Sequence, residues 1–139
     1  MATLAANAAR NFVAGDETEF PVIANDIIYE GAAVGENAAG YSRPLVAGDP
    51  FQGFAVAKVD NMGGAAGDKR VTVRRKGLVR LVVTGATAIT ANDGAKVYAS
   101  DDNSFTLTST SNSLIGVVSR WDASTDCLVH FDADAVALR

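Results

Sequence analysis

From residue 20 onward, short apolar runs alternate with polar turns at intervals of roughly eight to twelve residues. The runs are rich in Val, Ile, Thr and aromatic residues, and clusters of Gly, Asp, Asn or Ser separate them. This spacing is typical of a small β-sandwich or β-barrel, so the sequence predicts an all-β fold with almost no helix after residue 20. The predicted strands cover residues 20–23, 27–29, 40–46, 53–59, 70–75, 78–84, 95–99, 104–108, 114–121 and 127–131.

Residues 70–83 indicate how part of the sheet is oriented. Apolar residues share the odd positions, namely Val71, Val73, Val79, Leu81 and Val83. Basic or polar residues share the even positions, namely Arg70, Thr72, Arg74, Lys76 and Arg80. Successive side chains of a strand point to opposite faces, so one face is predicted to be core and the other solvated. Gly77 lets the chain bend or turn without changing this parity, and Arg75 is the one basic side chain on the apolar side.

The first nineteen residues have a different composition, rich in Ala and Asn, with isolated large apolar side chains at Leu4, Phe12 and Val13. Such a stretch buries little surface by itself, and a helix over residues 4–10 is too short to be stable in water without packing. Two interpretations remain open: a frayed terminus, or an arm that orders on a partner with Phe12 as its anchor. The sequence therefore predicts an extended N-terminal arm, residues 1–19, and a β-domain, residues 20–139.

Charge and composition limit the partners. The chain has 12 basic and 16 acidic side chains and a formal net charge of −4, which gives no general attraction to phosphate, so direct nucleic-acid binding is not expected. The single cysteine, Cys127, excludes an intramolecular disulfide. No apolar run approaches the length of a membrane-spanning helix, and the N-terminus lacks a secretory pattern. We expect a protein made in the cytoplasm with no membrane partner.

The candidate chemistry is sparse. Cys127 and His130 are the one possible thiol and imidazole pair, but three residues apart on a strand they point to opposite faces. The glycine-rich stretch 61–68 precedes a β-type run rather than a helix, which favours a hairpin or surface loop over a phosphate cradle. The acidic residues mostly sit beside turn formers and lack calcium-loop spacing. We therefore predict no catalytic residue, no metal site and no cofactor.

Two further groups of side chains have alternative interpretations. The basic cluster at residues 70–80 lacks interleaved aromatic residues, which favours a solvated sheet face or salt bridges to an acidic partner over a phosphate site. Trp121 with Tyr98 and Tyr41 could form a platform for sugars, although a single Trp at a strand end is more often part of the core.

The order of five segments resembles the capsid decoration, or cement, proteins of tailed bacteriophages. The segments are FPVIANDIIYEGAAVG from Phe20, AGDPFQGFAVAKVDN from Ala47, GLVRLVVTGA from Gly77, DGAKVYASDDNSFTLT from Asp93 and SLIGVVSRWD from Ser113. They are β-segments with Gly and Asp turns and contain no catalytic signature.

The resemblance implies a structural virion protein on the outer capsid surface, made in the host cytoplasm. Its partners would be the major capsid protein and further copies of itself in a homotrimer, with an arm reaching across neighbouring capsid subunits. We predict that the arm is anchored by Leu4, Phe12, Val13 and Phe20. The alternatives are a phage tail or fibre-base component, a small carbohydrate-binding module and, least favoured, a hydrolytic enzyme.

Overall fold

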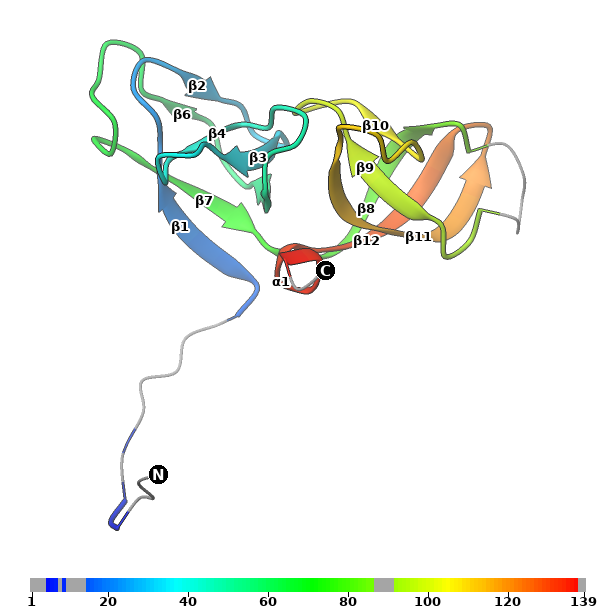
Figure 1. The fold of residues 1–139 in the computed structure, drawn as a ribbon, viewed down its shortest axis with the longest axis horizontal. Helices are drawn as coiled ribbons and strands as arrows, with labels where there is room; N and C mark the ends of the chain where they lie inside the picture. Colours follow the sequence, from blue (N-terminus) through cyan, green and yellow to red (C-terminus); the bar gives the residue numbers. More distant parts are fainter. Residues whose placement is uncertain (1–4, 8, 10–14, 87–91, 138–139) are drawn as a thin grey trace.

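The computed structural model describes residues 5–7, 9, 15–86 and 92–137, which fold into two β-sheet regions lying side by side (Figure 1). The strands of the first region are β1 (Glu17–Pro21), β2 (Ile27–Ile28), β3 (Ala33–Glu36), β4 (Ser42–Pro44), β5 (Phe51–Ala55), β6 (Val59–Asp60) and β7 (Arg70–Arg74). The second region contains β8 (Lys76–Thr84), β9 (Lys96–Ala99), β10 (Phe105–Thr106), β11 (Ser113–Ala123) and β12 (Asp126–Asp132). A short helix, α1 (Ala133–Ala137), follows β12. The all-β prediction is confirmed.

The first region is an antiparallel sheet with the strand order β1-β7-β5-β3-β4, and the β2–β6 pair lies beside it. Its two edges approach each other, because Val22 forms a parallel bridge with Ser42 just after β1 ends. Below, this region is called the N-terminal sheet. Its core is a cluster of small aliphatic side chains, Val22, Ile28, Ala32, Val34, Ala55, Val71 and Val73.

The second region is a closed barrel with the strand order β10-β8-β12-β11-β9. The parallel pairing of β10 with β8 and its antiparallel pairing with β9 close the ring. Gly116 permits the close approach of β11 to β12, since a Cβ at this position would collide with the carbonyl oxygen of His130. The register of β11 shifts after Val118, where a bulge changes which side chains point outward.

A nearly continuous run of strand from residue 70 to residue 84 joins the two regions. The odd positions of this run are buried or half-buried and the even positions are mostly exposed, so the predicted alternation is confirmed. Arg75 lies at the joint between β7 and β8. Gly77 follows with a φ of +145°, a backbone conformation that glycine adopts without strain.

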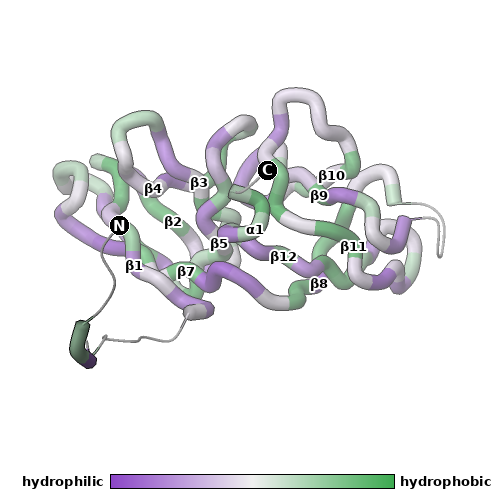
Figure 2. Tube along the Cα trace, turned by 60° about the horizontal axis from the view of Figure 1, so that its bottom comes forward, coloured by the Kyte–Doolittle hydropathy of each residue, from purple (hydrophilic) through white to green (hydrophobic). Residues whose placement is uncertain are grey.

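Aromatic rings pack where the two regions meet. Phe51 and Phe54 of β5 extend from the N-terminal sheet into the barrel cluster, where the Phe54 ring centroid lies 4.9 Å from that of Phe131. Phe105 packs on Phe54 from the barrel side, at 6.0 Å between centroids. The two regions therefore share one aromatic core. Figure 2 shows the short alternating hydrophobic and hydrophilic stretches along the strands that build it.

The structure corrects several sequence predictions. The described residues contain little helix, as expected, but the sequence did not predict α1, which begins where an Asp132 oxygen accepts hydrogen bonds from the backbone N–H groups of Asp134 and Ala135. The strand β3 is not among the predicted strands, and the predicted strand 53–59 divides into β5 and β6 around a turn. β1 begins at Glu17, inside the segment predicted to be the arm. The division into an arm and a β-domain stays a prediction.

Candidate functional site

Of the four predicted anchor residues, the structure describes Phe20. Leu4, Phe12 and Val13 lie outside the described residues. Phe20 belongs to β1, opposite Val71 of β7, and its half-buried ring packs against the core of the N-terminal sheet. The guanidinium group of Arg75 lies 5.2 Å from the ring centroid, a cation–π contact. Phe20 is thus packed within its own chain, and its role at an interface stays a prediction.

Arg75 fixes the point where the N-terminal segment joins the folded body. Its backbone N–H donates a hydrogen bond of 2.7 Å to the carbonyl oxygen of Asp16, and its own carbonyl oxygen accepts one of 2.8 Å from the N–H of Ala133. Its guanidinium donates to the carbonyl oxygen of Gln52 at 3.0 Å and to Asp134 Oδ1 at 2.6 Å. The root of the N-terminal segment therefore lies next to α1.

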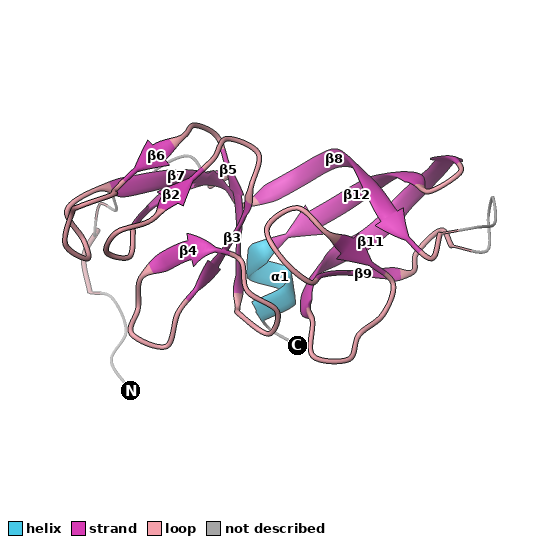
Figure 3. Ribbon diagram, turned by 90° about the horizontal axis from the view of Figure 1, so that it is seen from above, coloured by secondary structure: helices cyan, strands magenta, loops and turns pink. Residues whose placement is uncertain are grey.

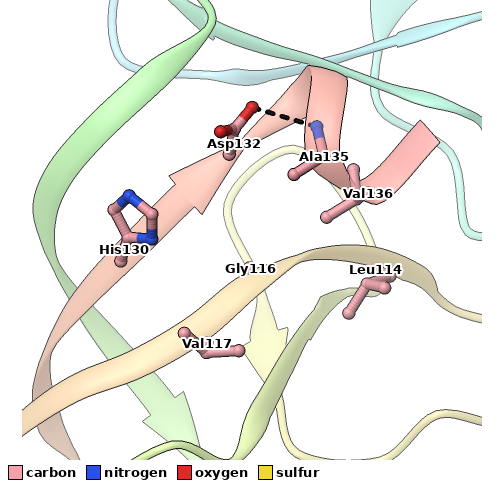
Figure 4. A pocket seen from close by; sticks show the side chains of 7 residues that line it. All are labelled: Leu114, Gly116, Val117, His130, Asp132, Ala135 and Val136. Carbon is pink, nitrogen blue, oxygen red and sulfur yellow. Dashed lines mark hydrogen bonds between the residues drawn. The ribbon is translucent and has the colours of Figure 1, made fainter. Parts of the chain in front are cut away.

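An apolar groove of about 110 Å³ lies between α1 and the outer face of the barrel (Figure 4). It is lined by Leu114, Gly116, Val117, His130, Asp132, Ala135 and Val136. Figure 4 shows Val117 and Leu114 on one side of the groove and the helix residues Ala135 and Val136 on the other. Asp132 lies at the end where α1 begins, and one of its oxygens is bound to the N–H of Ala135.

A second hollow, of about 230 Å³, lies next to this groove and is also lined by residues of α1. The two share Leu114 and Val136, and the second is bounded by the loop before β5, at Asp49 and Pro50. Figure 3 shows α1 between the N-terminal sheet and the barrel, so the helix and its two hollows occupy the seam between the regions. The hydrophobic pattern of the sequence did not reveal this seam, because α1 was not predicted.

The structure keeps the thiol and the imidazole apart. Cys127 is fully buried in the barrel core and His130 is exposed on the outer face of the same strand, as the three-residue spacing predicts. Burial, with added repulsion from Asp122 and Asp126, raises the pKa of the Cys127 thiol. A protonated thiol inside the barrel is a poor nucleophile. Among the residues that the structure describes, no group of three or more His, Cys, Asp or Glu side chains is placed to hold a metal ion.

The predicted basic cluster is largely paired within the chain. Arg74 pairs with Glu17 at 3.5 Å, Arg75 with Asp134 at 2.6 Å, and Arg80 with Asp122. Arg120 also binds Asp122, at 2.8 Å, and these contacts lower the pKa of the Asp122 carboxyl, the hydrogen bond from Arg120 having the largest effect. These ion pairs reduce the attraction of this face for phosphate.

Trp121 is partly buried against the barrel core, and its indole N–H donates to the carbonyl oxygen of Ser124 at 2.9 Å. These contacts favour a packing role over a sugar platform. No helix within the described ranges is long and apolar enough to cross a membrane.

The structure defines a small all-β protein built from two packed β-regions with apolar cores. An apolar seam beside α1 lies between the two regions and offers a surface for contact with another molecule. A model of the phage cement protein family matches residues 13–131, and the chain belongs to this family. A search of curated proteins found no match. The family assigns the protein to the structural components of the phage capsid and supports a role in stabilising it.

Proposed function

We propose that this protein binds the outer surface of a phage capsid and cements neighbouring major capsid proteins, stabilising the expanded head without catalysing a reaction. The observation that carries the proposal is the match to the phage cement protein family over residues 13–131. Because that match begins at Val13, it includes the end of the N-terminal segment as well as the β-regions. The protein would be made in the host cytoplasm and end in the virion.

The N-terminal arm is the proposed contact with the shell. Leu4, Phe12 and Val13 would insert into neighbouring capsid subunits, and the extended backbone would pair with an exposed sheet edge. Phe20 would act at the root of the arm, where its ring is held by Arg75. A homotrimer would link three weak arms, which raises avidity by about 10²- to 10⁴-fold when the spacing lets all three engage. Separating two neighbouring capsid subunits would then require the release of several arm contacts at once.

Shell binding by a full-length variant tests this mechanism. The triple variant Leu4→Ser, Phe12→Ser, Val13→Ser retains β1 and every described core residue, so we expect it to fold normally. Expanded, undecorated shells would be mixed with wild type or variant protein and pelleted. Wild type should saturate the shells in multiples of three and raise their melting temperature, while the variant should remain in the supernatant.

The matched control is Thr3→Ala, which lies in the same segment and removes no large apolar group. It should pellet like wild type. Light scattering of the unbound protein tests the trimer separately. Normal shell binding by the triple variant would refute the arm mechanism, and failure of the wild type to pellet would refute the cement function for that shell.

A further inference from the structure

The strand β1 lies at the border of the N-terminal sheet and, among the described strands, pairs with β7 alone (Figure 1). The hydrogen bonds at its two ends show which of its residues face β7. The carbonyl oxygen of Asp16 accepts from the N–H of Arg75, and the N–H of Val22 donates to the carbonyl oxygen of Lys69. In an antiparallel pair, residues that exchange hydrogen bonds alternate with residues that do not, so the even-numbered residues of β1 bond to β7.

The odd-numbered residues of β1 therefore direct their backbone groups away from β7. Glu17 and Glu19 each present an N–H and a carbonyl oxygen, whereas Pro21 presents a carbonyl oxygen alone. No hydrogen bond between described residues involves these outward groups, which we call the free edge of β1. An edge strand with unpaired backbone groups can add one further extended strand.

The side chains along this free edge define what such a strand would carry. Glu19 lies opposite Thr72 and has no ion-pair partner among the described residues, whereas Glu17 pairs with Arg74 at 3.5 Å. An added strand would place one side chain beside Glu19, at about 4.5–5.5 Å between Cβ atoms, where an opposite charge stabilises the pair. Its next side chain would lie on the other face, beside the half-buried ring of Phe20. The free edge thus suits an extended segment in which a basic residue is followed by an apolar one.

A second copy of this chain fits the free edge poorly. An antiparallel pairing centred on Glu19 sets two Glu19 carboxylates opposite each other, and like charges in this position are destabilising. In the same pairing Pro21 faces Glu17 of the second copy and has no N–H to donate to it. Charge and hydrogen bonding therefore favour a different protein as the partner.

We propose that a strand of a capsid subunit, with a Lys or Arg side chain beside Glu19, adds to the free edge of β1 when the protein binds the shell. This inference rests on the proposed function. Glu17 and Glu19 lie within residues 1–19, the predicted arm, so an arm that binds the shell brings this edge against it. The N-terminal sheet then gains a strand from the shell, and main-chain hydrogen bonds join the two proteins.

Hydrogen exchange resolved to single residues tests the proposal directly. In the free protein the N–H groups of Glu17 and Glu19 should exchange fast, and those of Thr18 and Phe20, which face β7, more slowly. Shell-bound protein would be held in deuterated water, quenched and analysed by fragmentation and mass spectrometry. We expect the Glu19 amide to exchange about tenfold more slowly on the shell, as one added hydrogen bond would give.

Two variants change the free edge and leave the hydrogen bonds to β7 in place. Glu19→Pro removes the outward N–H and should weaken shell binding about three- to tenfold in the pelleting experiment. Glu19→Lys keeps the N–H but reverses the charge, so it should weaken binding at low salt and approach wild type at high salt. The matched control is Glu30→Lys, which makes the same charge change at an exposed turn outside β1 and should bind like wild type.

The outcomes separate this inference from the cement function. Saturable pelleting of a wild type whose Glu19 amide still exchanges as in the free protein would overturn the added strand and leave the cement function standing. Equal pelleting of Glu19→Lys and Glu30→Lys at low salt would also overturn the proposal, because no cation would then lie beside Glu19. Protection of the Glu19 amide that rises with concentration in the free protein would assign the edge to a second copy instead. A wild type that does not pellet refutes the cement function itself, and this inference with it.

Discussion

The N-terminal sheet and the barrel are stabilised by different kinds of contact. The barrel is closed by backbone pairing and filled with side chains such as Ile115, Val129 and Phe131. The N-terminal sheet is joined at its edges by the single bridge from Val22 to Ser42. Of the five buried polar residues in the described part of the chain, four belong to its strands and loops, namely Ser42, Asp49, Gln52 and Asn61.

These buried polar groups form hydrogen bonds that tie loops to strands. Asp49 receives two hydrogen bonds from the Arg43 guanidinium, at 2.8 and 2.9 Å, and the hydroxyl of Ser42 donates to Gln52. The hydrogen bond to Asp49 is the main reason why the pKa of Arg43 is raised. The N-terminal sheet also places Phe51 and Phe54 in the barrel cluster, so it depends on the barrel for part of its core.

The largest expected effect comes from truncating the shared aromatic core. Phe131→Ala removes a ring that is 2 % exposed and contacts both Phe51 and Phe54. We expect a loss of about 3–5 kcal/mol in the free energy of unfolding, measured by urea denaturation. Amide hydrogen exchange should show faster exchange in both regions, because the lost ring belongs to both.

Ile28→Ala is the matched variant within the N-terminal sheet, where Ile28 is fully buried in the aliphatic cluster. It should accelerate exchange in the N-terminal sheet and leave the barrel amides protected. If Phe131→Ala also spared one region, the two would be independent, and the shared core would not couple them.

The second prediction concerns a buried polar group. Asn61 is 2 % exposed, and its side-chain amide donates to the carbonyl oxygens of Ile23 at 2.8 Å and Ala65 at 3.1 Å. Asn61→Ala leaves both carbonyls without this partner, so we expect a loss of about 1–3 kcal/mol by urea denaturation. Exchange should accelerate locally, at residues 22–28 and 61–68. The neighbouring Met62 is 57 % exposed, and Met62→Ala should change stability by less than about 0.5 kcal/mol.

The loop that contains Asn61 is held by contacts that the local sequence pattern does not reveal. The glycine-rich stretch 61–68 was predicted as a hairpin or flexible loop, and a strand does follow it, but β6 and β7 are not paired with each other. Gly64 lies so close to Asn61 that a Cβ at this position would collide with the Asn61 side-chain oxygen. The order of this loop depends on contacts with Ile23 and Asn25, far away in the sequence, which local pattern does not reveal.

The same difference between local pattern and long-range contact separates the confirmed predictions from the features that the sequence did not predict. Alternation over residues 70–83 is a local signal, and it predicted the core face of β7 and β8 correctly. The helix α1 has five residues, too few to be stable alone, and it forms where Ala133 is buried and Asp132 caps its first turn. Without α1 there was no seam to predict, and the groove beside it was missed.

The third prediction tests the joint between the two regions. Arg75→Ala removes the hydrogen bond to Gln52, the contact with Phe20 and the ion pair with Asp134. We expect urea denaturation to show a loss of about 1–2 kcal/mol, mostly from the half-buried hydrogen bond. Asp134→Ala removes the ion pair alone and should cost less than about 0.5 kcal/mol, because the Asp134 side chain is 65 % exposed. Equal losses in the two variants would assign the stabilisation to the ion pair instead.

The smallest expected effect lies in the loop where the barrel touches the N-terminal sheet. The carbonyl oxygen of Asp102 accepts a hydrogen bond of 2.9 Å from the N–H of Ala33. Partial burial, followed by repulsion from Asp101, raises the pKa of the Asp102 carboxyl above its ordinary value of 3.8. The folded state then binds this proton more tightly than the unfolded state, so this contribution to stability is present below pH 3.8 and is lost as the pH rises through the folded-state pKa.

Asp102→Asn should therefore stabilise the protein at pH 7, by at most about 0.5 kcal/mol. At pH 3 it should make little difference, because the Asp102 carboxyl is then mostly protonated in both the folded and the unfolded state. Urea denaturation of wild type and variant at the two pH values measures this difference. Asp101→Asn is the comparison variant: it removes the same repulsion between the two carboxylates, but it also removes one of the two oxygens that accept hydrogen bonds from the Asn103 N–H and the Ser104 hydroxyl, so its gain at pH 7 should be smaller than that of Asp102→Asn. An equal gain for Asp102→Asn at both pH values would exclude charge as the cause and point to a packing effect of the amide where the two regions meet.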